Sequence, residues 1–136
     1  MSNKTFIQNL GFTPKENAIG IFQKKYADGY CIEVDFETSK INYGELIKSE
    51  SKTTQNFSQP ENWVVLECVN RLLEKGYKPN NIILEKTYPL GHNNSGRLDV
   101  LVTKDDGTVY LMIECKTFGA EFDKAFSKLK KDGGQL

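Results

Sequence analysis

Two carboxylates and an ammonium group lie on the two arms of a hairpin predicted over residues 96–116. Asp99 interrupts the first apolar run, and Glu114 and Lys116 end the second. The Asp-Gly pair at 106–107 is typical of the turn between two hairpin strands. Because side chains alternate across a strand, Glu114 and Lys116 point to one face, and strand pairing brings Asp99 close to them.

This grouping suits the metal-assisted hydrolysis of a phosphodiester. Mg²⁺ prefers oxygen ligands, commonly one or two carboxylates with water and substrate phosphate. A cation held there would polarise a phosphoryl oxygen and lower the pKa of a bound water. Lys116 would orient that water or stabilise charge in the transition state. The alternative interpretation is a surface hairpin with solvated charges, but Asp99 and Glu114 interrupt apolar runs, which favours a site.

Two short segments of this hairpin resemble the motifs of a known nuclease superfamily. They read Gly96-Arg97-Leu98-Asp99 and Ile113-Glu114-Cys115-Lys116. This G-x-x-D and E-x-K pair is similar to the signature of the PD-(D/E)XK superfamily, and more narrowly to the N-terminal nuclease domain of type I and related restriction-modification polypeptides. The resemblance spans about residues 58–136. It implies Mg²⁺, for which Mn²⁺ substitutes, and cleavage of double-stranded DNA. It also implies that Asp99 and Glu114 hold the metal, helped by the carbonyl of Cys115, while Lys116 positions the attacking water.

The resemblance further implies a carboxylate from the helix before the hairpin. That helix is predicted to open at 58–61 and to run to about Lys75, where Gly76 ends it. Glu61 lies at the edge of the apolar stripe and is favoured, whereas Glu67 falls opposite the stripe. A capping box between Ser58 and Glu61 explains Glu61 about as well as catalysis does. Glu85, in the strand predicted at 82–90, is a candidate for a position near the active face, but a charge there is more often a rim residue.

Basic residues on both sides of the E-x-K motif are candidates for contacts with DNA phosphates. Arg97 follows a polar loop bounded by glycines, and such a loop can approach DNA closely. Lys124, Lys128 and Lys131 lie together on the outer side of a helix predicted at 121–131. A solvated lysine face is an equally good explanation of these three residues.

Gln135 follows two glycines, as the glutamine of a Q-x-x-x-Y motif does in one branch of the superfamily. The tyrosine of that motif would fall beyond Leu136. We therefore expect an N-terminal piece of a longer polypeptide, with motor, methylase and target-recognition modules as its partners. Cleavage of both strands would involve a dimer.

The first part of the chain alternates between apolar and polar residues with turn residues between the runs, which predicts an antiparallel meander. Its strands are predicted at 19–26, 30–36 and 40–43. We therefore predict an α/β (α+β) fold, in which a restriction-endonuclease-like mixed sheet flanked by helices follows an N-terminal β meander. The expected division is a meander at 1–45, a polar linker at 46–59, and a nuclease-like core at 60–136 that is truncated at its C-terminus.

Composition limits the range of partners and compartments. The 136 residues suit one domain, and 18 basic and 18 acidic side chains leave no net charge. A free-standing DNA binder is usually more basic, so either the basic residues cluster or other modules hold the DNA. Three cysteines without metal-ligand spacing fit a reducing cytoplasm. There is no apolar run of about 18 residues that could span a membrane.

The leading hypothesis is an Mg²⁺-dependent DNA endonuclease domain of a restriction-modification enzyme. One alternative is a nuclease-like module that binds DNA or a partner protein without cutting. Another is a stand-alone junction or repair nuclease with the same core. Loss of metal-dependent cutting in Asp99→Ala and Lys116→Ala separates the cleaving proteins from the binding module.

Overall fold

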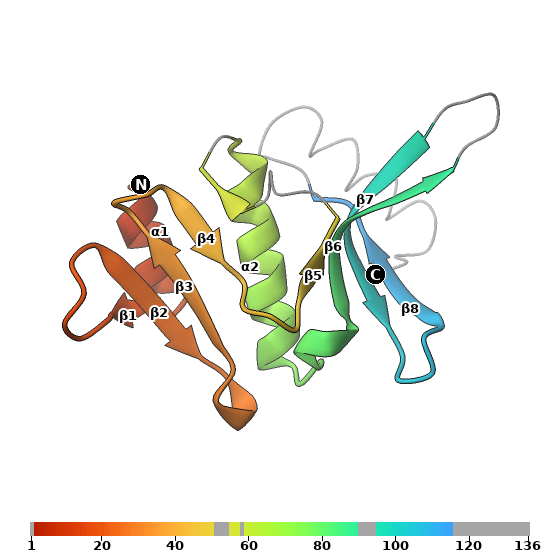
Figure 1. The fold of residues 1–136 in the computed structure, drawn as a ribbon, viewed down its shortest axis with the longest axis horizontal. Coiled ribbons are helices and arrows are strands. Elements are labelled where there is room, and N and C mark those ends of the chain that lie inside the picture. The colour runs from red at the N-terminus through yellow and green to blue at the C-terminus, as the bar shows by residue number, and fades with distance from the viewer. Residues whose placement is uncertain (1, 51–54, 58, 90–94, 116–136) are drawn as a thin grey trace.

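The computed structural model describes residues 2–50, 55–57, 59–89 and 95–115, and for 87–89 and 95–98 it describes the backbone only. Helix α1 (Asn3–Asn9) comes first, and the longer helix α2 (Glu61–Glu74) lies between two four-stranded sheets (Figure 1). The first sheet contains β1 (Thr13–Pro14), β2 (Ile21–Lys25), β3 (Cys31–Asp35) and β4 (Lys40–Asn42). The second contains β5 (Lys48–Ser49), β6 (Ile82–Pro89), β7 (Ser95–Thr103) and β8 (Val109–Ile113). The predicted class, mixed α and β with an N-terminal antiparallel meander, is confirmed.

The first sheet is antiparallel throughout, in the order β1-β2-β3-β4. Ile32 and Val34 are fully buried, as the alternating pattern of β3 predicts. The turn after β3 is held by Asp35, whose carboxylate accepts hydrogen bonds from the N–H groups of Glu37 and Thr38 at 2.8 and 3.2 Å. Short polar side chains favour such turns because they bond to the backbone two or three residues on.

The second sheet is mixed, because β5 runs parallel to β6 whereas β6, β7 and β8 are antiparallel. The predicted hairpin is the β7–β8 pair. Its turn closes through the N–H of Lys104, which donates to the carbonyl of Thr108 at 2.8 Å. Gly107 has a φ of +87° in this turn, a conformation that glycine adopts without steric cost.

The segment 46–59 is not only a linker, which corrects one expectation. Lys48–Ser49 form β5 and pair in register with Ile83 and Leu84 of β6. Ile47, just before β5, is buried in the core. A two-residue strand carries no detectable periodicity, and its partner lies more than 30 positions away, so a local pattern could not predict it.

Helix α2 supplies the centre of the hydrophobic core. Its buried apolar residues are those of the predicted stripe: Val65, Leu66, Val69, Leu72 and Leu73. They join one continuous cluster with buried residues of both sheets, including Val34 of β3 and Val100 of β7. Burying such a side chain contributes roughly 1.5–3 kcal/mol each, so α2 packs the two sheets together. Gly76 ends the helix with a φ of +97°, as predicted.

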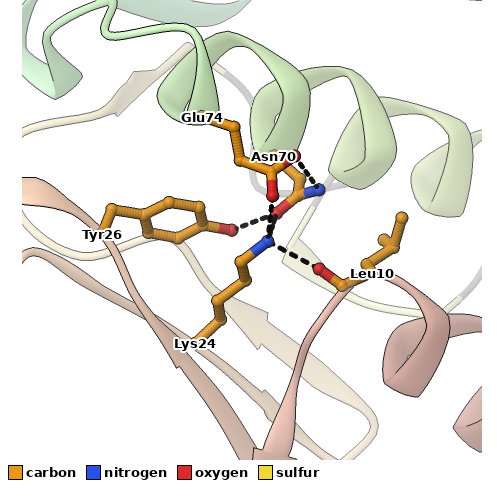
Figure 2. Close-up of polar contacts among 5 residues, drawn as sticks. All are labelled: Leu10, Lys24, Tyr26, Asn70 and Glu74. Atoms are coloured by element: carbon orange, nitrogen blue, oxygen red, sulfur yellow. Dashed lines mark hydrogen bonds and ion pairs between the residues drawn. The ribbon is translucent and has the colours of Figure 1, made fainter.

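A polar network also joins the meander to α2 (Figure 2). The Nζ of Lys24 in β2 donates to the carbonyl of Leu10, to Oδ1 of Asn70 and to Oε2 of Glu74, at 2.6, 2.7 and 2.8 Å. The hydroxyl of Tyr26 also donates to Oδ1 of Asn70, at 2.7 Å. The N-terminal meander therefore packs directly on the helix of the predicted core. Neither described helix has the length and apolar character needed to cross a membrane.

Candidate functional site

Asp99 and Glu114 oppose each other across the β7–β8 hairpin. The register pairs Val100 of β7 with Ile113, the last residue of β8. The next pair of positions along the two strands therefore sets Asp99 opposite Glu114. The backbone N–H of Cys115 donates a hydrogen bond of 2.8 Å to Oδ2 of Asp99. Hairpin pairing thus brings Asp99 to the end of the second strand, as predicted.

The two carboxylates differ in their surroundings. Asp99 is half-buried within the sheet, whereas Glu114 is exposed. Like charges directly opposite each other on neighbouring strands are destabilising. A divalent cation would offset this repulsion, so the placement of Asp99 and Glu114 is compatible with a cation site.

Two cysteines lie beneath this end of the hairpin. The thiol of Cys115 is buried and shares a hydrogen bond with the thiol of Cys68 in α2. That hydrogen bond and burial raise the pKa of Cys115 far above its usual range, so its side chain stays a neutral thiol. The same hydrogen bond lowers the pKa of Cys68, although burial opposes the shift.

The two candidate helix carboxylates lie in different environments. Glu61 is exposed in the first turn of α2, and Glu67 is half-buried, with an ion pair of 3.3 Å to Arg71. The N-cap of α2 is Pro60, which makes no side-chain capping bond, and Ser58 lies outside the described residues. The choice between Glu61 and Glu67 stays a prediction.

Most of the predicted basic residues fall outside the part of the chain that the structure describes. These residues are Lys116, Lys124, Lys128 and Lys131, and Gln135 lies there too. For Arg97 the structure describes the backbone only, which pairs with Thr87 of β6. The roles assigned to these six residues therefore stay predictions.

The structure contradicts the rim position that the sequence favoured for Glu85. The pattern of β6 predicts a rim position, but only 4% of Glu85 is exposed. Its φ is +51°, in the left-handed region, inside a strand. No local signal reveals its burial, because Glu85 stands between the apolar residues 82–84 and the polar residues Lys86 and Thr87.

The described residues contain no ready-made group of three or more His, Cys, Asp or Glu side chains that could hold a metal ion. Mg²⁺ is commonly bound through one or two carboxylates, with waters and substrate phosphate completing its shell. The carboxylate oxygens of Asp99 and Glu114 therefore fit a magnesium ion whose remaining ligands are water and substrate phosphate.

These features and the family comparison together define the chain as a domain of a restriction-modification enzyme. The family model that matches residues 60–131 is described as "Type I restriction enzyme R protein N terminus (HSDR_N)". The match covers more than half of the chain, and the protein belongs to this family. It includes α2 and the whole β7–β8 hairpin. Comparison with curated proteins gave no match.

Proposed function

We propose that this domain is the DNA-cleaving part of a type I restriction enzyme, an Mg²⁺-dependent endonuclease of the PD-(D/E)XK type. The observation that carries the proposal is the placement of Asp99 opposite Glu114 in a hairpin that the family match includes. Two carboxylates in register on adjacent strands are costly for a fold alone, and they suit a divalent cation.

Asp99 and Glu114 would hold the cation, together with the carbonyl of Cys115. When bound, the ion would polarise the phosphoryl oxygen and generate a nucleophilic water near neutral pH. The Cys115 N–H donates to Oδ2 of Asp99 at 2.8 Å and so holds this carboxylate at the end of β8. Lys116, the next residue along the chain, would orient the water and balance the negative charge that develops on the phosphate.

Binding of DNA by this domain alone is expected to be weak, because the chain carries no net charge. Arg97 and the lysines at 124, 128 and 131 would contact phosphates near the site. The affinity and target choice would come from the other modules of the enzyme. The isolated domain should therefore nick DNA slowly and without sequence preference.

Nicking of supercoiled plasmid tests this proposal. The purified chain is incubated with Mg²⁺, with Mn²⁺ and with EDTA, beside Asp99→Asn, Glu114→Gln and Lys116→Ala. Glu16→Gln is the matched control, since it removes one exposed carboxylate from the loop before β2. We expect metal-dependent nicking by the wild type and the control, and its loss in the three site variants.

Calorimetric titration with Mn²⁺ accompanies the cutting assay. If the wild type binds Mn²⁺ and Asp99→Asn does not, the result would support the metal site, even if cutting needs further modules of the enzyme. A wild-type chain that neither nicks DNA nor binds Mn²⁺ would contradict the proposal and favour a module that binds without cutting.

A further inference from the structure

Glu85 of β6 lies opposite Asp99 of β7. The residue pairs on both sides of this position are formed in the ladder: Leu84 with Val100, and Lys86 with Leu98. The ladder omits the pair between Glu85 and Asp99 themselves. All the remaining residue pairs described between β6 and β7 are formed. Over this described stretch the two strands are thus irregular only at the position of the candidate site.

The irregularity arises from the backbone of Glu85. Its φ of +51° lies in the left-handed region, which residues other than Gly, Asn and Asp rarely adopt. The other described non-glycine residues with positive φ lie in turns or a short 3₁₀ helix: Asn17, Asp28 and Ser39. Glycine would hold this conformation at lower cost. The backbone alone therefore gives no reason for a glutamate, and such strain is characteristic of functional sites.

The side chain of Glu85 is also in an unusual environment. Among the described residues it is the one buried acid, with 4% exposure. The other buried polar residues there are Asn62, which donates to the carbonyl of Asn56, and Asn70, which belongs to the Lys24 network. A buried carboxylate is costly unless it is paired and hydrogen-bonded, so a glutamate is an exceptional residue at this level of the sheet.

Glu85, Asp99 and Glu114 occupy one level on three consecutive segments of the sheet. The three do not form a ready-made ligand set in the described part of the chain. A role of Glu85 at this site would therefore run through its neighbour Asp99. Its negative charge beside the site strengthens the attraction for a divalent cation.

We propose that Glu85 is a positioning residue for Asp99, an inference that rests on the proposed nuclease function. The break at Glu85 allows β7 to turn the Asp99 carboxylate toward the N–H of Cys115. The buried charge of Glu85 then keeps that carboxylate directed to the end of β8, where Glu114 follows.

Two substitutions separate the backbone of Glu85 from its charge. Glu85→Gln keeps the shape and removes the charge, whereas Glu85→Gly removes the side chain and suits the left-handed backbone. Thermal melting establishes that both are folded. Glu85→Asp restores the charge on a shorter side chain, and Glu16→Gln is again the control.

The first measurement is the amide spectrum of the ¹⁵N-labelled, metal-free protein. We expect the Cys115 N–H signal, which reports the bond to Asp99, to move in Glu85→Gln and Glu85→Gly but not in Glu16→Gln. The second measurement is Mn²⁺ affinity by calorimetry. We expect both variants to bind roughly tenfold more weakly, as other residues that orient metal ligands do when replaced, with partial recovery in Glu85→Asp.

The inference would be overturned if Glu85→Gln and Glu85→Gly leave both the Cys115 signal and the Mn²⁺ affinity unchanged. In that case, loss of Mn²⁺ binding in Asp99→Asn would still support the proposed function. If the wild type neither nicks DNA nor binds Mn²⁺, the proposed function fails. The Cys115 signal then decides the positioning role by itself, because it is measured without metal.

Discussion

Lys24 of β2 and Asn70 of α2 are joined by a hydrogen bond of 2.7 Å, although the two residues are 46 positions apart in the sequence. Asn70 is buried, and the side chain of Lys24 is only 14% exposed. The ammonium group also pairs with Glu74 one turn further along the helix. This contact fixes the N-terminal sheet on the helix that backs the candidate site.

Lys24→Met should destabilise the protein, because it removes the charge and leaves Oδ1 of Asn70 with fewer donors. We expect a loss of about 1–3 kcal/mol in the free energy of unfolding, measured by urea denaturation. The neighbouring Lys25→Met is the control, since Lys25 is exposed and its replacement should change stability by less than about 0.5 kcal/mol. Equal losses in the two variants would show that the network does not stabilise the fold.

Asp99→Asn and Asp99→Ala should differ in stability while both lose cation binding. Asparagine keeps an oxygen that can accept the Cys115 N–H, so its melting temperature should stay near that of the wild type. Alanine removes the acceptor of a part-buried hydrogen bond and should cost about 1–3 kcal/mol. Melting curves with calorimetric Mn²⁺ titrations test both statements. Tight Mn²⁺ binding by Asp99→Asn would rule out a role of the carboxylate charge.

Gly44→Ala should be much more damaging than Gly107→Ala. Both glycines have positive φ, +82° and +87°, so alanine pays a similar conformational cost of about 1–2 kcal/mol at each. A methyl group at Gly44 would lie 2.5 Å from the hydroxyl of Tyr30, whereas at Gly107 nothing lies within 4 Å. Overpacking should add about 1–3 kcal/mol at Gly44 only. Urea midpoints of the two variants measure the difference, and similar midpoints would contradict it.

The ion pair of Asp105 should make stability depend on pH in the acid range. The side chains of Asn81 and Lys78 donate hydrogen bonds of 3.0 Å to this carboxylate and lower its pKa from the ordinary value of 3.8. A lowered pKa in the folded state contributes stability above the ordinary value, and this contribution is lost as the pH falls through the folded pKa.

The melting temperature of Asp105→Asn should therefore lie below that of the wild type at about pH 6, and the gap should be smaller at a pH well below 3.8. Because Asp105 is exposed, the gap should be small and should shrink in high salt. A gap of the same size at both pH values would show that the charge of Asp105 has no part in it.

Local sequence was sufficient to predict the hairpin and the central helix. Asp106 and Gly107 mark the turn between two apolar runs, and the spacing from Val65 to Leu73 marks the buried face of α2. These features depend on residues that are close in the sequence, where hydrophobic periodicity and turn residues determine the local structure. The approach of Asp99 to Glu114 follows from the hairpin alone, and so the placement of these two residues was predictable.

The remaining features were decided by contacts between distant segments. The pairing of β5 with β6, the bond between Lys24 and Asn70, and the contact of Cys68 with Cys115 each join residues at least 30 positions apart. Such contacts form only when the packed core brings separate elements together, so no local pattern carries them. The burial of Glu85 belongs to the same class, because its strained backbone is tolerated only where the surrounding sheet and helix hold it in place.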